Sequence, residues 1–265
     1  MKTSKLGFGI TGTLELEVVK AIAIRAEEIG VDSLWVNDTP GGDSLARLEV
    51  AASVTSRLTL ATGVIPVDRR LVDAVVEDVR RRELPLDRLI LGIGSSAPPS
   101  PLTRIKEGLA DLQAAFHVPI LVGALGPKMR QLGAERGNGL LFNWLTPDHA
   151  RETTTLMKDQ AAACGNDQVM SATYVRTALG ADAKSRLETE AARYARIRAY
   201  AANFARLKIT AIATAVCSDT AEGIAGGILA FDGAVDHAIV RAITPNDDLD
   251  HYLRLLDAIA PLVSS

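Results

Sequence analysis

Short apolar runs alternate with longer amphipathic stretches along almost the whole chain, and this alternation is the strongest constraint on its fold. Several short runs, such as residues 89–94, are apolar throughout, which is typical of strands buried on both faces in a parallel sheet. The longer stretches carry apolar residues at helical spacing, as in residues 14–29, which end before Gly30. The chain therefore predicts repeated strand–helix units.

The pattern indicates eight such units. We expect strands at residues 6–10, 33–36, 58–64, 89–94, 119–123, 139–143, 172–179 and 237–243. The predicted helices lie at 14–29, 43–56 and 69–82, around 102–112, from 127, at 147–163 and over 249–259. Eight units in about 250 residues specify a (β/α)8 TIM barrel. A doubly wound sheet is the competing architecture, but it usually has fewer strands.

The stretch between the seventh and eighth strands, residues 181–233, is too long for one crossover. It predicts a helical insertion before the last strand, made of one Ala-rich helix and a shorter one. The Ala-rich helix is expected to run through Tyr194, Ile197, Ala201 and Phe204. Without repeats, low-complexity tracts or a linker, residues 1–265 are predicted to form a single domain.

Composition narrows the function classes. The net charge is −3, which argues against a nucleic-acid-binding protein. No apolar run reaches about 18 residues, and the first residues lead directly into a strand without a signal-peptide core. Two cysteines and four histidines show no metal-ligand spacing, so we expect no metal site. We expect a cytoplasmic protein with a small-molecule substrate and no nucleic-acid or membrane partner, and a homodimer stays open.

The sharpest motif is Gly123-Ala124-Leu125-Gly126-Pro127-Lys128-Met129. A predicted strand ends in glycine, a short loop follows, and Pro127 stands where a helix should begin. Free N–H groups at a helix N-terminus, its dipole and Lys128 together favour an anion. The residues alone leave a plain turn with a solvated lysine equally open.

Two other strand ends carry candidate site residues. Asp38 closes the second strand, where a carboxylate of a barrel could relay a proton, although a turn aspartate is as consistent with the following Pro40. Gly63 closes the third strand, where either close approach to a ligand or a simple strand end fits.

Together these segments resemble the bacterial luciferase-like family, which comprises flavin-dependent and deazaflavin-dependent oxidoreductases on a TIM barrel. The best match covers residues 119–132 followed by 139–147, with the Gly-Pro-Lys-Met block at its centre. Residues 26–38, 57–64 and 88–94 match in the same order, so the resemblance covers most of the chain.

The resemblance implies site roles that the residues alone do not give. It implies a cis peptide at Gly63–Val64 against the cofactor ring, and a phosphate site in the loop from Gly123 to Lys128. It also places Asp38 and Ser95 near the polar edge of the cofactor. The implied cofactor-binding residues are Gly63, Val64, Ser95, Gly123, Ala124, Gly126, Pro127, Lys128 and Asn143.

Members that bind coenzyme F420 are often compact like this chain, whereas oxygen-using FMN members are often longer. The resemblance thus favours a hydride transfer between F420 and a small organic substrate, with Asp38 as the proton relay. An FMN-dependent monooxygenase and a non-catalytic flavin- or deazaflavin-binding protein are the alternatives. Sugar-phosphate dehydrogenases of the family have a histidine where this chain has Thr39, and an acidic residue near Ala97-Pro98-Pro99. Both departures argue against that substrate class.

Overall fold

A computed structural model of the chain describes residues 4–95 and 99–263. Within these ranges, eight parallel strands form a closed barrel: β1 (Lys5–Thr11), β2 (Ser33–Asn37), β3 (Thr59–Thr62), β5 (Leu89–Gly94), β6 (Ile120–Gly123), β7 (Gly139–Asn143), β8 (Met170–Leu179) and β10 (His237–Ile243). The barrel closes because β10 pairs with β1 on one side and with β8 on the other. The predicted TIM barrel is confirmed.

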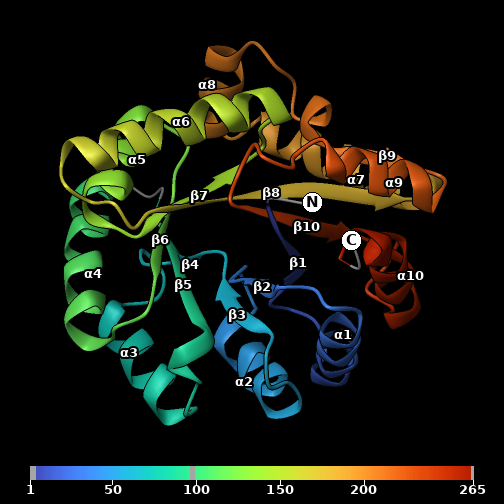
Figure 1. The fold of residues 1–265 in the computed structure, drawn as a ribbon, viewed down its shortest axis with the longest axis horizontal. Coiled ribbons are helices and arrows are strands. Elements are labelled where there is room, and N and C mark those ends of the chain that lie inside the picture. Colours follow the sequence, from blue (N-terminus) through green and yellow to red (C-terminus); the bar gives the residue numbers. More distant parts are fainter. Residues whose placement is uncertain (1–3, 96–98, 264–265) are drawn as a thin grey trace.

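Helices surround the strands on the outside (Figure 1). They are α1 (Leu16–Ile29), α2 (Ser44–Val54), α3 (Val72–Arg81), α4 (Pro101–Ala115), α5 (Pro127–Arg136), α6 (Pro147–Ala163), α9 (Ala221–Leu229) and α10 (Leu249–Ile259). Single 3-10 turns lie at η1 (Leu86–Arg88), η2 (Ile212–Thr214) and η3 (Ala260–Leu262). Gly30 ends α1 in the left-handed conformation, with φ of 88°, as its place after the amphipathic stretch predicts. No helix in the described part of the chain is long and apolar enough to span a bilayer.

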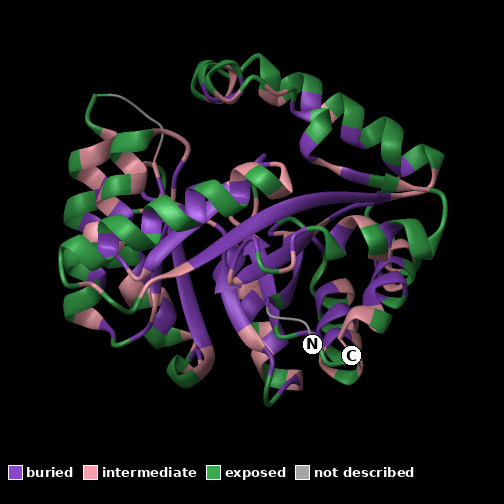
Figure 2. Cartoon of the chain, turned by 45° about the horizontal axis from the view of Figure 1, so that its top comes forward, coloured by how far each residue is buried: buried purple, intermediate pink, exposed green. Residues whose placement is uncertain are grey.

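The core has two apolar layers. One fills the space between the strands and the inner faces of the helices, whose outer faces are exposed (Figure 2). The other fills the barrel interior and consists of Trp35, Ala61, Ile90, Leu121, Leu141, Ala172, Tyr174 and Ile239. These residues come from alternate positions of their strands, because side chains along a strand alternate between the two faces.

The third strand differs from the prediction. The expected strand at 58–64 ends at Thr62, and pairing with β5 resumes in a separate short strand, β4 (Ile65–Pro66). Between them the backbone bulges at Gly63 and Val64, and the Thr62 hydroxyl takes over, donating to the Gly92 carbonyl and accepting from the Gly92 N–H. At this point the Thr62 side chain, not the backbone of the third strand, bonds the backbone of β5. The strand is therefore interrupted although the sequence continues apolar.

The insertion before the last strand is confirmed, but its Ala-rich part is two helices, not one. α7 (Ala181–Ala195) ends in a tight turn, where the N–H groups of Arg196 and Ile197 bond carbonyls three residues back, and α8 (Arg198–Leu207) follows. The break lets the rings of Tyr194 and Tyr200 meet edge to face at 4.7 Å. A further strand, β9 (Val216–Ser218), pairs with the end of β8 and is too short to be recognised from its sequence.

Candidate active site

A polar layer covers the apolar barrel interior at the carboxyl ends of the strands. Two residues beyond Trp35, Leu141, Tyr174 and Ile239 of the interior, the same strands carry Asn37, Asn143, Arg176 and Arg241. Strand alternation directs these polar residues to the same side as their apolar predecessors. In TIM barrels, ligand sites lie at this end.

The bulge after β3 shapes the floor of this site. The Gly63–Val64 peptide is cis, as the resemblance implied. The Val64 side chain fills the space beside two strand ends, since a Cβ placed on Gly94 or Gly123 would lie 2.7 or 2.8 Å from its methyl groups. Beneath Gly63 lies the Tyr174 hydroxyl, which is buried and has no hydrogen-bond partner among the described residues. The Val64 side chain therefore leaves no room for a Cβ at position 123.

The loop between β6 and α5 leaves the N-terminus of α5 accessible to a ligand. Pro127 is the first residue of α5, and Gly126 before it provides no side-chain cap, so the first N–H groups of the helix have no intrahelical partner. A Cβ on Gly126 would meet no atom within 4 Å, and Lys128 is exposed. Ala124, by contrast, packs into the core and can offer a ligand only its backbone.

Two arginines add positive charge near this loop. Arg206 of α8 donates to the Leu125 carbonyl at 2.8 Å and also contacts the Asn203 side chain. Arg130 of α5 donates to Thr153 at 3.1 Å, and burial together with the nearby charge of Arg206 lowers the pKa of Arg130 to about 10. Neither arginine has a carboxylate within ion-pair distance in the described ranges. The loop region thus carries uncompensated positive charge, which favours an anion.

Across the mouth, Arg176 is held by a set of close contacts. Its guanidinium donates to Glu190 of α7 at 2.6 Å and to Asn143 at 2.5 Å, and it stacks 3.6 Å from the Trp144 ring centre. Burial opposes ionisation of Glu190, but the charges of Arg176 and Arg241 lower the pKa of this carboxyl below its usual value overall. Asn143, a sequence-predicted site residue, is thereby tied to the insertion. Trp144 packs under the insertion instead of facing the cavity.

Asp38 lies at the end of β2, but its carboxylate is engaged by charged groups of the α2–α3 side. Arg70 contacts it at 3.2 Å and the Ser44 hydroxyl donates to it at 3.0 Å. Arg70 also pairs with Asp43 and Asp78, which makes an ionic network. The neighbouring Thr39, not Asp38, lines the mouth cavity.

Ser95 follows β5 and accepts a hydrogen bond from Arg104 of α4 at 3.0 Å. Ala97 and Pro98, where the family comparison marks a missing acidic residue, lie outside the described residues. In the described ranges, no group of three or more His, Cys, Asp or Glu side chains could hold a metal ion.

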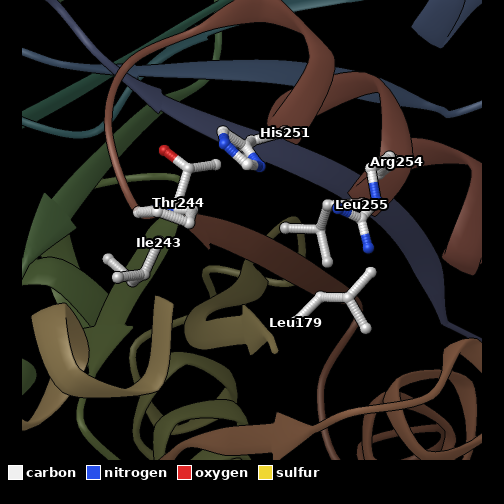
Figure 3. Close-up of a pocket in the computed structure, with 7 residues that line it drawn as sticks. Leu179, Ile243, Thr244, His251, Arg254 and Leu255 are labelled. Atoms are coloured by element: carbon white, nitrogen blue, oxygen red, sulfur yellow. The ribbon is translucent and has the colours of Figure 1, made fainter. Parts of the chain in front are cut away.

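Two cavities adjoin the end of β10. The larger, of about 540 Å³, lies at the barrel mouth between β1, β2, β10 and α7. The smaller lies between the ends of β8 and β10 and helix α10, where Leu179, Leu255 and His251 line it (Figure 3). Its volume of about 10 Å³ holds no more than a water molecule, so the mouth cavity is the candidate substrate site.

Several charged residues of the mouth escaped the sequence analysis. Arg176 lies near the carboxyl end of the predicted strand at 172–179, where a barrel places its site. Arg241 and Glu190 lie 65 and 14 residues from Arg176 in the chain, so the sequence does not show that the three are neighbours. The available signal was a charged residue inside an otherwise apolar strand, as in residues 237–243. Glu190 gave no signal, because only the fold brings its helix to Arg176.

No protein-family model matches the chain. It is 28% identical over 173 residues to a 5,10-methylenetetrahydromethanopterin reductase of Methanolobus tindarius, a match that covers 52% of each chain. The matched part thus spans about half the length of this curated relative.

Solved structures share the fold over nearly the whole chain. An F420-dependent secondary alcohol dehydrogenase, solved with an F420–acetone adduct, is 16% identical with a TM-score of 0.73, covering 98% of this chain and 99% of that one. The oxygenating constituent of 3,6-diketocamphane monooxygenase from Pseudomonas putida, in complex with FMN, is 13% identical with a TM-score of 0.68, covering 97% of each. At these identities the likeness shows the fold, and the resemblance to luciferase-like oxidoreductases is confirmed at that level.

Proposed function

We propose that the protein is an oxidoreductase that transfers a hydride between coenzyme F420 and a small organic substrate. The observation that carries the proposal is the β6–α5 loop, which opens a helix N-terminus, Lys128 and the uncompensated charge of Arg130 and Arg206 toward an anion. The solved structures of the same fold that hold an F420 adduct or FMN support a cofactor of this kind.

The residues present fit such a cofactor. The loop Gly123–Lys128 would hold its phosphate through backbone N–H groups and Lys128, while Val64 and the buried Tyr174 hydroxyl would lie beneath its ring. Asn143 and Ser95 would offer polar contacts at the neighbouring strand ends. When bound, the deazaflavin supplies the hydride chemistry, and the protein positions it and excludes water.

Proton transfer is assigned to Asp38. Its carboxylate is the acidic group at the end of β2, and its neighbour Thr39 reaches the mouth cavity. Because Asp38 also accepts from Ser44 and pairs with Arg70, it has a second role in holding the β2–α2 loop against α3. Asp38→Asn separates these two roles, because asparagine can still accept a hydrogen bond from Ser44 but cannot take up a proton.

An FMN-dependent monooxygenase is the second candidate function. The FMN-bound neighbour with the same fold favours it. In that case, reduced FMN would occupy the same loop and oxygen would be consumed. A flavin- or deazaflavin-binding protein without catalysis is the third, since Thr39 stands where the sugar-phosphate dehydrogenases of the family have a histidine.

Identification of the cofactor that co-purifies with the protein tests the proposal. The chain is expressed in a host that makes both cofactors, and the bound species is identified by absorption and mass spectrometry. We expect F420. Recovery of FMN, together with oxygen consumption on reduction, would support the monooxygenase instead.

We further propose that residues 1–265 act as one domain in the cytoplasm, with a homodimer as the assembly to test by light scattering. The continuous pairing of β10 with β1, which joins the two ends of the chain, supports the single domain.

A further inference from the structure

Two neighbouring strands aim arginines at the same mouth. Arg176 of β8 and Arg241 of β10 are register partners, and each follows an interior residue by two positions. Glu190 pairs with Arg176 at 2.6 Å. Arg241 is half-buried, donates to the Ala242 carbonyl and has no carboxylate within 4 Å in the part of the chain that is described. One of the two adjacent guanidinium groups therefore lacks a counter-ion.

The mouth cavity lies directly over this arginine. Its charged lining consists of three arginines and two carboxylates: Arg186, Arg193, Arg241, Glu190 and Asp247. Arg186 and Asp247 neutralise each other at 3.0 Å, and Glu190 is paired with Arg176, so the positive charges of Arg193 and Arg241 remain in the lining. The rest of the wall includes hydroxyls of Thr11, Thr13 and Thr39, and the rings of Tyr194 and Tyr252.

The cavity and the phosphate loop lie on opposite sides of the barrel. In the closed ring of strands, β1 is separated from β6 by β2, β3 and β5 on one side, and by β10, β8 and β7 on the other. A cofactor held by its phosphate at β6 would thus leave the β1–β10 side of the mouth for the substrate. The arginine excess on that side is separate from the loop that would hold the cofactor.

We propose that this cavity binds the carboxylate of an organic acid substrate, with Arg241 and Arg193 as its recognition groups. A guanidinium group matches a planar carboxylate through two parallel hydrogen bonds. Inorganic phosphate can compete for the same two guanidinium groups, so the test includes it as a separate arm. Arg176, fixed by Glu190 and Asn143, is a positioning residue that keeps Glu190 from neutralising Arg241. The assignment of this ligand as the substrate rests on the proposed function; its binding does not.

Matched acid and amide pairs test the proposal. Binding of benzoate and benzamide, and of acetate and acetamide, is measured by ligand-observed NMR with the protein alone and with F420 added. The F420 titration is recorded separately, so that loss of cofactor binding and loss of acid binding are distinguished. Variants are Arg241→Gln, Arg241→Lys and the exposed Arg193→Gln. The control is Arg151→Gln on α6, an exposed arginine that does not line the cavity.

We expect each acid to bind at least tenfold more tightly than its amide, and Arg241→Gln to abolish this preference, because a charged hydrogen bond is lost. Arg241→Lys should keep part of it, Arg193→Gln should weaken it, and Arg151→Gln should leave it unchanged. Thermal unfolding of each variant confirms that it is folded. Equal binding of acids and amides, an unchanged preference in both Arg241 variants, or tighter binding of inorganic phosphate than of either acid would overturn the proposal. Acid binding without F420 binding would leave the carboxylate site standing and refute the proposed function.

Discussion

The substitution Glu190→Gln tests the reasoning about the buried charges at the mouth. It removes the charge that pairs with Arg176 at 2.6 Å, where only 3% of the Arg176 side chain and 18% of the Glu190 side chain are exposed. Removal of one partner from a buried pair costs about 3–5 kcal/mol, since the other charge stays buried alone. Because glutamine still accepts a hydrogen bond and Glu190 retains some solvent contact, we expect a loss of about 3 kcal/mol in the free energy of unfolding.

Urea unfolding at neutral pH measures this loss as a shift of the midpoint at unchanged slope. Glu188→Gln, two residues earlier on α7, is the matched control, because Glu188 and Lys184 lie 4.0 Å apart with more than half of each side chain exposed. Its cost should stay below about 0.5 kcal/mol. If Glu190→Gln costs no more than Glu188→Gln, the buried pair contributes nothing and the electrostatic description of the mouth is wrong.

The pH dependence has a defined sign. The pKa of Glu190 is lowered in the folded protein from its ordinary 4.5, so its contribution to stability is present above that value. The contribution is lost as the pH falls through the lower folded-state pKa. The stability difference between the native protein and Glu190→Gln should therefore be constant from neutral pH down to 4.5 and shrink below it. A difference that grows on acidification would contradict the lowered pKa.

Four further substitutions address the β6–α5 loop, the end of β2 and the floor of the site. Lys128→Ala should weaken F420 binding by about 1–3 kcal/mol in calorimetry, and by less in high salt because Lys128 is exposed; unchanged affinity at low salt would remove Lys128 from the site. Asp38→Asn should lower the turnover rate by about 10²–10⁴ while F420 affinity falls less; an unchanged rate with reduced thermal stability would leave Asp38 only its contacts with Arg70. Gly123→Ala should cost about 1–3 kcal/mol of stability, because its Cβ would lie 2.8 Å from Val64, whereas Gly126→Ala, with open space around it, should cost under about 0.5 kcal/mol.

The barrel could be predicted from sequence because its cause is local. Fully apolar runs such as residues 89–94 and helical spacing such as that before Gly30 are written in consecutive residues, and they match β5 and α1. The split of the third strand could not be predicted from residue patterns, since Thr62 replaces backbone pairing through contacts with Gly92, thirty residues away. The break between α7 and α8 also escaped, because the alanine-rich sequence continues through it.

The same distinction holds for the candidate site: its contiguous segment could be predicted from sequence, and the residues that only the fold brings together could not. The β6–α5 loop is contiguous in sequence, so its glycines, proline and lysine could be recognised as a unit. The arginines of the mouth come together only through barrel closure, which makes Arg176 and Arg241 register partners across 65 residues of chain. The reason for Gly123 also lies outside its own segment, in the side chain of Val64.

Calorimetric titration of the purified apo-protein with coenzyme F420 and with FMN, each at low and high salt, tests the central claim most directly. The account predicts one-to-one binding of F420 that is tighter than that of FMN and weakens with salt, because an exposed lysine and a helix N-terminus hold the phosphate. If neither cofactor binds, the account is contradicted. If FMN binds more tightly than F420, the flavin-dependent monooxygenase becomes the better description of the protein.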